Sequence, residues 1–180
     1  MKRLIFLTIS LFLLTAQTAR AGQMLNKGQY ARFHQNENFK ITPPPEFNKM
    51  RPIKNGLKLF NDKDQLTITI VALKVDNPNN LSDLKLINKF KNVNIRKEFF
   101  NNLNSLSQRK IKNYTFKNLY GKAIFEFVLM DDEAAVKPAK SIIFYENSKE
   151  YRITLETENN SDLEKHSHFI PQILTLIGII

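Results

Sequence analysis

The first part of the chain alternates polar stretches with short apolar runs that are typical of strands. One short strand is predicted at Phe39–Thr42, and Pro43–Pro45 ends it because proline cannot donate a hydrogen bond to a ladder. Leu57–Phe60 predicts a second strand. Leu66–Val75 is β-branched and apolar on both faces, so we expect a central strand that is covered by a layer on each side.

Helical spacing replaces this pattern after residue 80. Asn80 is expected to cap a helix in which Leu84, Ile87 and Phe90 form the apolar stripe. A second helix is predicted from apolar residues at i, i+4, i+8 and i+11, namely Ile95, Phe99, Leu103 and Leu106. We expect both helices to lie on one face of the sheet.

Two antiparallel hairpins are predicted in the second half of the chain. Tyr114–Gly121 has a period of two, and Ala123–Met130 runs back beside it. Ser141–Tyr145 and Tyr151–Leu155 form the second pair around the turn residues Asn147–Ser148. In this second hairpin apolar and polar residues alternate cleanly, which predicts one buried side and one solvated side.

The last segment predicts a helix. Ser161 and Glu164 have the spacing of a capping box, and an apolar stripe follows to Ile177. Pro171 lies inside the stripe, so the helix should kink or restart near Ile170. The order of elements predicts an α+β fold: an α/β/α sandwich with a central, mainly antiparallel sheet, two helices after the early strands and a C-terminal helix.

The N-terminus has the pattern of a secretory signal peptide. Lys2 and Arg3 precede the apolar run Leu4–Leu14, and Ala19–Ala21 is a small-x-small cleavage pattern. The apolar run is shorter than the roughly 20 residues that span a bilayer, which favours cleavage over anchoring. The expected organisation is therefore a signal peptide at 1–21, a flexible lead-in at 22–37 and a single globular domain at 38–180.

Cleavage would place the mature protein in the periplasm or outside the cell, with no transmembrane span. The chain has no Cys, so it lacks the residue that a lipoprotein signal requires, and no disulfide can stabilise the exported domain. Loss of residues 1–21 removes three of the 27 basic side chains and none of the 17 acidic ones, which lowers the formal charge from +10 to +7.

The fold pattern resembles the PsbP-type family, which includes the extrinsic protein of photosystem II and the DcrB-like bacterial envelope proteins. The resemblance rests on the proline-rich start Phe39–Phe47, the two hairpins, the tyrosine-led strand Tyr151–Leu155 and the closing helix Phe169–Leu174 with its internal proline. It covers roughly residues 38–180 and implies an α/β/α sandwich that acts as a non-catalytic accessory to larger assemblies. No functional residue of the family can be matched to this chain, and the missing lipobox Cys departs from the lipid-anchored DcrB-like members.

Positive charge is concentrated in the middle of the chain. Residues 85–122 contain ten basic side chains and one acidic one, whereas residues 123–180 contain five basic and ten acidic side chains. If the two helices and the following strand are neighbours, their cations form one basic face that attracts an anionic envelope polymer, lipid headgroups or an acidic protein. The alternative is that these lysines only solvate the helix faces. Nucleic acid is not expected as a partner, because export would separate the protein from it. The basic face comprises Lys85, Lys89, Lys91, Arg96, Lys97, Arg109, Lys110, Lys112, Lys117 and Lys122.

The sequence contains no catalytic, cofactor or metal motif. Serine elbows, phosphate-binding glycine loops and paired cysteines are all missing from it. His166 and His168 are two positions apart on the predicted helix, which is a poor spacing for a shared metal, and Asp131–Glu133 is expected to be a solvated loop. An accessory or binding protein is therefore the leading interpretation. The alternatives are a small envelope hydrolase that uses these histidines and the acidic loop, and a structural subunit whose apolar C-terminus inserts into a partner.

Overall fold

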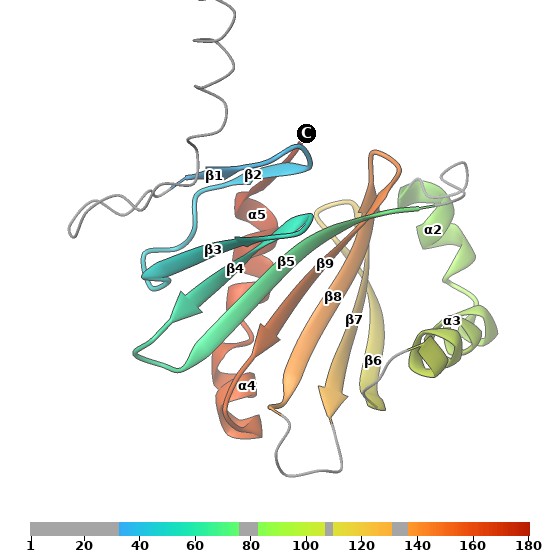
Figure 1. Ribbon diagram of the computed structural model, residues 1–180. Helices are drawn as coiled ribbons and strands as arrows, with labels where there is room; N and C mark the ends of the chain where they lie inside the picture. Colours follow the sequence, from blue (N-terminus) through green and yellow to red (C-terminus); the bar gives the residue numbers. More distant parts are fainter. Residues whose placement is uncertain (1–32, 76–82, 107–109, 131–136) are drawn as a thin grey trace, which may run out of the picture. The chain divides into compact units, whose positions relative to one another are not determined.

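The computed structural model describes residues 33–75, 83–106, 110–130 and 137–180. They belong to the second of two units into which the chain divides, residues 1–31 and 32–180. An antiparallel sheet of seven strands forms the centre of this unit, in the order β3-β4-β5-β9-β8-β7-β6 (Figure 1). Its strands are β3 (Lys49–Ile53), β4 (Gly56–Asn61), β5 (Leu66–Lys74), β6 (Lys110–Leu119), β7 (Lys122–Met130), β8 (Ala139–Glu146) and β9 (Lys149–Glu156).

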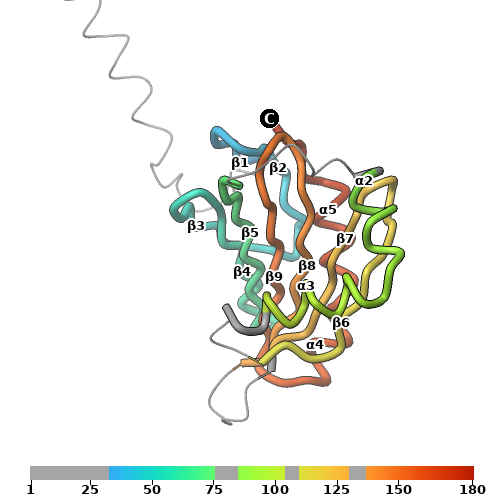
Figure 2. The backbone as a smooth tube through the Cα atoms, turned by 90° about the vertical axis from the view of Figure 1, so that its right-hand side faces the viewer, coloured from blue at the N-terminus to red at the C-terminus, as the bar shows by residue number. Residues whose placement is uncertain are grey.

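The two faces of the sheet carry separate hydrophobic clusters. On one face the cross-strand neighbours Ile70, Ile153 and Ile142 are buried, and α4 (Asn160–His166) and α5 (Phe169–Leu176) pack over them. On the other face α2 (Asp83–Lys89) and α3 (Val93–Leu106) contact β7 and β6. Figure 2 shows these two helices crossing in front of the β6 end of the sheet. The α/β/α sandwich and its antiparallel sheet are thus confirmed.

Aromatic rings hold α2 and α3 to the sheet. The ring centroid of Phe125 on β7 lies 4.6 Å from that of Phe90 and 4.5 Å from that of Phe99. Tyr114 on β6 stacks on Phe100 of α3 at 4.2 Å. Aromatic pairs at these separations contribute about 0.5–1.5 kcal/mol each beyond the burial of their area. The helix spacing predicted from the sequence therefore reflects a real aromatic core.

A second, three-stranded sheet joins the two ends of the described chain. It consists of β1 (His34–Gln35), β2 (Phe39–Ile41) and β10 (Ile177–Ile179), with β2 in the middle. Phe39 and Ile41 point into the main core, where Ile177 and Ile179 also pack. This sheet was not predicted: β10 falls where the sequence pattern predicted the end of a helix, and β1 lies within the range 22–37.

Both hairpins are closed by tight two-residue turns. Tyr120 and Gly121 between β6 and β7 have φ values of +53° and +77°, and Asn147 and Ser148 between β8 and β9 have φ values of +48° and +61°. Two consecutive positive φ values are the signature of the tight turn whose twist matches antiparallel strands. The two predicted hairpins are therefore confirmed.

Several local predictions need correction. Strand β3 was missed because Pro52 argues against a strand, yet β3 lies at the edge of the sheet, where proline is tolerated. The side chain of Asn159, rather than that of Ser161, caps α4 by accepting a hydrogen bond from the Asp162 N–H at 3.0 Å. Pro171 sits in the first turn of α5, so the helix restarts there, one of the two predicted outcomes. On β5 one side is buried, but Thr67, Thr69 and Val71 are only half-buried, so its second cover is partial.

Candidate functional site

Five of the expected cations lie on or between the two helices α2 and α3. Lys85 and Lys89 are four residues apart and share one exposed stripe of α2, about 100° around the helix axis from the buried Leu86. Lys91 follows in the turn, and Arg96 and Lys97 belong to the first turns of α3. Glu98 is the single acidic side chain between residues 85 and 106. We call these five residues the helix cations: Lys85, Lys89, Lys91, Arg96 and Lys97.

Arg96 fixes the corner between the two helices. Its Nη1 donates hydrogen bonds to the main-chain oxygens of Phe90, at 2.5 Å, and Lys91, at 3.0 Å. These carbonyls follow the last turn of α2, where no further helical N–H can reach them. Asn92 caps α3 through its side-chain oxygen, which accepts from the N–H of Asn94 at 2.9 Å. Arg96 therefore holds the positions from which Lys91 and Lys97 project.

The cations of the β6–β7 hairpin face the other way. Lys112 pairs with Val128 and Lys117 pairs with Ile124, and both partners pack on the cluster beneath α4 and α5. Side chains of directly paired residues point to the same side of a sheet, so these lysines lie on the side opposite to α2 and α3. The same pairing places Lys110 and Lys122 on that side.

Carboxylates compensate part of this hairpin surface. Glu126 forms ion pairs of 3.0 Å with both Lys117 and Lys140, and Lys122 is paired with Glu146. Burial alone would raise the pKa of Glu126, but the hydrogen bonds and charges of Lys117 and Lys140 outweigh it and hold that pKa below its usual range. The hairpin surface is therefore a mixed-charge surface around a stable carboxylate.

The structure does not bring the predicted basic face together on one side. Helix cations and hairpin cations are separated by the sheet, and Arg109 lies outside the described residues. The predicted basic face did not include other cations that the sheet brings close to charged neighbours. Lys140 joins Glu126 from the acidic third of the chain, and Arg51 on β3 is directly paired with Lys58 on β4. The alternation of side chains along β4 and β8 predicts which side of the sheet each of these cations lies on, but only when the pairing of the strands is known.

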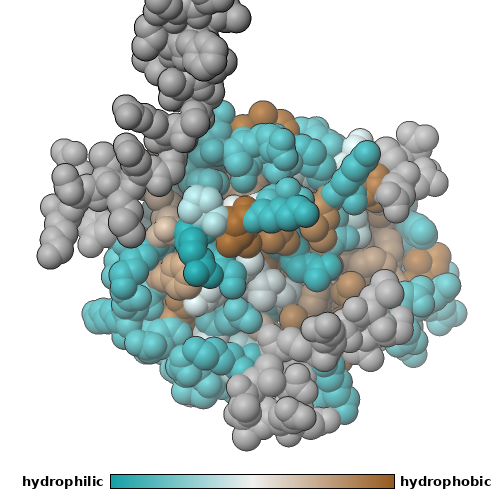
Figure 3. Space-filling model, viewed as in Figure 1, coloured by the Kyte–Doolittle hydropathy of each residue, from teal (hydrophilic) through white to brown (hydrophobic). Residues whose placement is uncertain are grey.

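The side of the sheet that carries α2 and α3 is polar over its β3–β5 end. Arg51, Lys58 and Thr69 form one row across three strands. Figure 3 shows mainly hydrophilic side chains with apolar ones between them on this side. Further along the row, Ser141 and Thr154 share a hydrogen bond of 2.8 Å. These groups satisfy one another or face solvent, and their arrangement brings no nucleophile to an adjacent base.

The histidines do not form a metal site. His166 is only 7% exposed and stacks on Phe169, whereas His168 is exposed and its Nδ1 lies 3.1 Å from the main-chain oxygen of Lys165. Within the described ranges, no group of three or more His, Cys, Asp or Glu side chains is placed to hold a metal ion. The acidic residues Asp131–Glu133 lie outside the described residues. Among the described residues, the two histidines therefore contribute no metal-binding cluster to the alternative hydrolase site.

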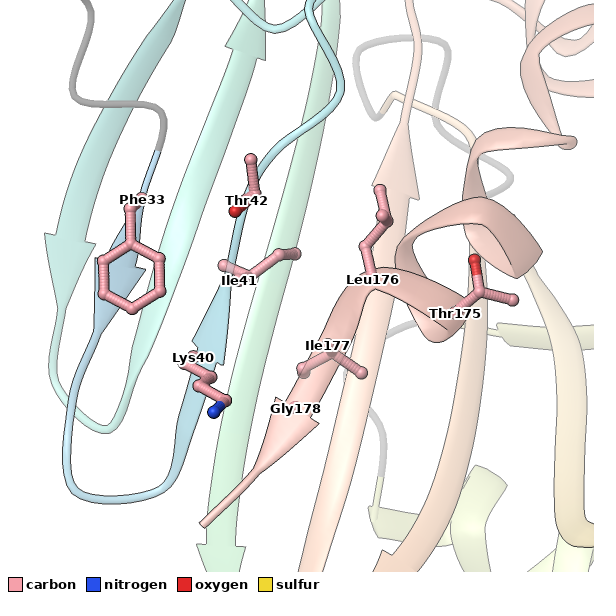
Figure 4. A pocket seen from close by; sticks show the side chains of 8 residues that line it. All are labelled: Phe33, Lys40, Ile41, Thr42, Thr175, Leu176, Ile177 and Gly178. Carbon is pink, nitrogen blue, oxygen red and sulfur yellow. The ribbon is translucent and has the colours of Figure 1, made fainter.

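A shallow pocket of about 240 Å³ lies on the small sheet (Figure 4). Phe33 and Leu176 stand on its two sides, with Thr42 between them and Lys40 at one end. A second pocket, of about 400 Å³, is formed by the segment before β3, including Pro45 and Asn48, and by the end of β4 with the turn that follows it, from Asn61 to Asp64. Asn61 and Asp64 hydrogen-bond to each other there at 2.8 Å, so their polar groups are already engaged.

The described helices are all too short or too polar to cross a membrane. The sandwich, with its antiparallel sheet and small second sheet, defines the class of the protein as a PsbP-like α+β fold. Among solved structures it is similar to the cyanobacterial PsbP (CyanoP) of Synechocystis sp. PCC 6803, known from a solution structure, with a TM-score of 0.52 and 10% sequence identity over 88% of this chain and 99% of that chain. This likeness is one of fold. No protein-family model and no curated protein matches the sequence.

Proposed function

We propose that this protein is an exported, non-catalytic accessory protein that docks on an anionic partner through the helix cations. The observation that carries the proposal is the five basic side chains on and between α2 and α3, against two acidic residues, Asp83 at the start of α2 and Glu98 on α3. A surface of one sign attracts its opposite over about one Debye length, roughly 8 Å at physiological salt.

Three features support the choice of the helix cations over the hairpin cations. Lys117 and Lys122 are already paired with Glu126 and Glu146, so a partner would have to compete with internal carboxylates. Lys89 and Lys97 are exposed on helices whose other side is anchored by phenylalanine rings. Arg96 fixes the corner between them, so a partner meets a preformed arrangement of charges.

Export is the second part of the proposal. The sequence pattern of residues 1–21 supports a cleaved signal peptide and a periplasmic or secreted location. The PsbP-like fold supports an accessory role only by analogy, because a fold does not specify a function. The proposed partner is an anionic envelope polymer, a lipid headgroup surface or an acidic protein. The test below uses one probe for each of these three classes of partner.

The test compares two variants of equal charge. The first replaces Lys89, Lys91 and Lys97 with Gln. The control replaces the exposed Lys54, Lys63 and Lys165 with Gln, which removes the same three charges elsewhere. Binding to phosphatidylglycerol vesicles, to poly-L-glutamate and to a purified anionic cell-wall polymer is measured from 50 to 500 mM NaCl.

We expect the first variant to bind at least one of the three probes about tenfold more weakly than the control, and the affinity of the native protein to fall steeply with salt. Equal losses in both variants would show an unspecific charge effect. Binding that salt leaves unchanged, or no binding to any probe at 50 mM NaCl, would rule out electrostatic docking by this surface.

A further inference from the structure

The small sheet presents an outer face on which exposed apolar side chains lie beside polar ones. Because Phe39 and Ile41 of β2 point into the core, Lys40 and Thr42 point away from it. The register places Gly178 beside Lys40, and Leu176 at the end of α5 lines the same pocket as Thr42. Phe33 precedes β1 on the other side of β2. We call the surface formed by Phe33, Lys40, Thr42, Leu176 and Gly178 the outer face.

Large apolar side chains on this face remain in contact with solvent. Phe33 is 53% exposed and Leu176 is 41% exposed, and the adjoining Ile180 is also exposed. Figure 4 shows Phe33 and Leu176 on either side of the small Thr42 side chain, which leaves the shallow pocket between them. Apolar side chains that gather on a surface in this way mark a contact with a partner or with a membrane.

Lys40 adds charge without interrupting this apolar surface. A Cβ atom at Gly178 would lie 3.0 Å from both Cγ and Cε of Lys40, so the lysine stem lies flat across the glycine. The apolar stem thus covers the strand while the ammonium group reaches its border. This is the arrangement by which lysine keeps its methylene groups on an apolar surface and its charge at a polar boundary.

We propose that the outer face contacts the surface of a lipid bilayer that contains anionic lipids. Phe33 and Leu176 enter the boundary between headgroups and acyl chains, and the Lys40 ammonium pairs with a lipid phosphate. The shallow, open form of the pocket favours this occupant over a folded protein, because protein anchors are held in well-packed pockets. A lipid bilayer needs no deep pocket, because its fluid acyl chains can adapt to the shape of the protein surface. The contact is separate from the helix cations and does not depend on the function proposed for them.

A single tryptophan tests this placement directly, since the native chain contains none. In Leu176→Trp the fluorophore is on the outer face. In the matched control Leu73→Trp it replaces a leucine on β5 with nearly the same exposure, 40% against 41%. Emission is recorded with vesicles of phosphatidylcholine alone and of phosphatidylcholine and phosphatidylglycerol in equal amounts, at 100 mM NaCl.

We expect the emission of Leu176→Trp to shift to the blue with the anionic vesicles and that of Leu73→Trp to stay unchanged. Adding Phe33→Gln should weaken binding about tenfold, and adding Lys40→Gln should reduce the preference for phosphatidylglycerol. Replacing Lys89, Lys91 and Lys97 with Gln in the Leu176→Trp background should leave the shift in place.

Three results would overturn the proposal. An unchanged Leu176→Trp spectrum, or equal shifts in both tryptophan variants, would show that the outer face does not enter the bilayer. A shift that disappears when the three helix lysines are replaced would show that the helix cations make the contact instead. A blue shift without vesicles that grows with protein concentration would identify a second copy of the chain as the occupant.

Discussion

The hydroxyl of Tyr151 donates a hydrogen bond of 3.2 Å to the main-chain oxygen of Asn38, which lies 113 residues earlier in the chain. The same oxygen accepts the N–H of Ile180 at 3.1 Å. One buried carbonyl thus ties strand β9 of the large sheet to strands β2 and β10 of the small sheet. Burial, with a smaller effect of the Glu146 charge, raises the pKa of Tyr151, which keeps the hydroxyl protonated as a donor.

Tyr151→Phe should therefore loosen the junction between the sheets while the core remains packed. We expect the free energy of unfolding to fall by about 1 kcal/mol, the usual net value of one hydrogen bond. Amide hydrogen exchange should accelerate at Ile180 and in β2. Tyr114→Phe is the control, because its ring stacks on Phe100 at the other end of the sheet. Unchanged exchange in the small sheet would show that this hydrogen bond does not hold the junction.

Asn159→Ala should destabilise α4 by about 1 kcal/mol, because the Asn159 side chain accepts the Asp162 N–H at the start of the helix. In a domain of this size that loss lowers Tm by about 2–4 °C. Ser161→Ala, at the position that the sequence favours as a cap, should change stability by less than about 0.5 kcal/mol. Thermal unfolding of both variants measures the difference. A loss of stability that is larger for Ser161→Ala than for Asn159→Ala would support the predicted capping box of Ser161 and Glu164 instead.

Tyr120→Asn should stabilise the β6–β7 hairpin. Tyr120 is 72% exposed, so its ring gains little from packing, and its φ of +53° is unfavourable for a bulky side chain. Asn tolerates this conformation, and Asn-Gly is the preferred pair for such a turn. We expect a gain of about 0.5–1 kcal/mol in urea unfolding. Gly121→Ala, at a φ of +77°, should have the opposite sign. A loss of stability in Tyr120→Asn would show that the ring makes a stabilising contact.

Glu126→Gln should lower stability at neutral pH by about 1 kcal/mol, since it removes a carboxylate that Lys117 and Lys140 both bind. The pKa of Glu126 is lower in the folded state than in the unfolded state. Its contribution is therefore complete above the unfolded pKa of about 4.3 and is lost as the pH falls through the folded value.

Urea unfolding from pH 7 to pH 3 should accordingly show the native protein and Glu126→Gln converging below about pH 4. Glu164→Gln, which changes an exposed carboxylate on α4, is the control and should stay parallel to the native protein. A gap between native and Glu126→Gln that persists at pH 3 would mean that packing, rather than charge, causes the loss.

The predicted elements came from local rules, and the missed strand β10 depends on pairing with a strand that is distant in sequence. The helices and hairpins follow from the spacing of Phe90, Phe99 and Phe125 and from turn residues such as Asn147, all of which act over a few residues. Strand β10 has three residues and exists because β2 lies beside it. Nothing within Ile177–Ile179 itself distinguishes a short strand from the end of a helix.

The basic face was misjudged for a related reason. Counting charges along residues 85–122 ignores that a strand sends alternate side chains to opposite sides and that a helix pair covers one of these sides. Lys112 and Lys97 are close in sequence, yet the sheet separates them. The bulge between Lys112 and Thr115 changes which side of the sheet the following side chains point to, and the sequence of this segment does not predict it.

The strand order also has a kinetic consequence. β3, β4 and β5 pair consecutively, and so do β6, β7, β8 and β9, but β5 meets β9 across more than seventy intervening residues. During synthesis, the apolar strand β5 has an unpaired edge until Lys149–Glu156 has been made. We therefore expect the pairing of β5 with β9 to be a late step of folding, and the one at which a chaperone that covers the open edge of β5 would have most effect.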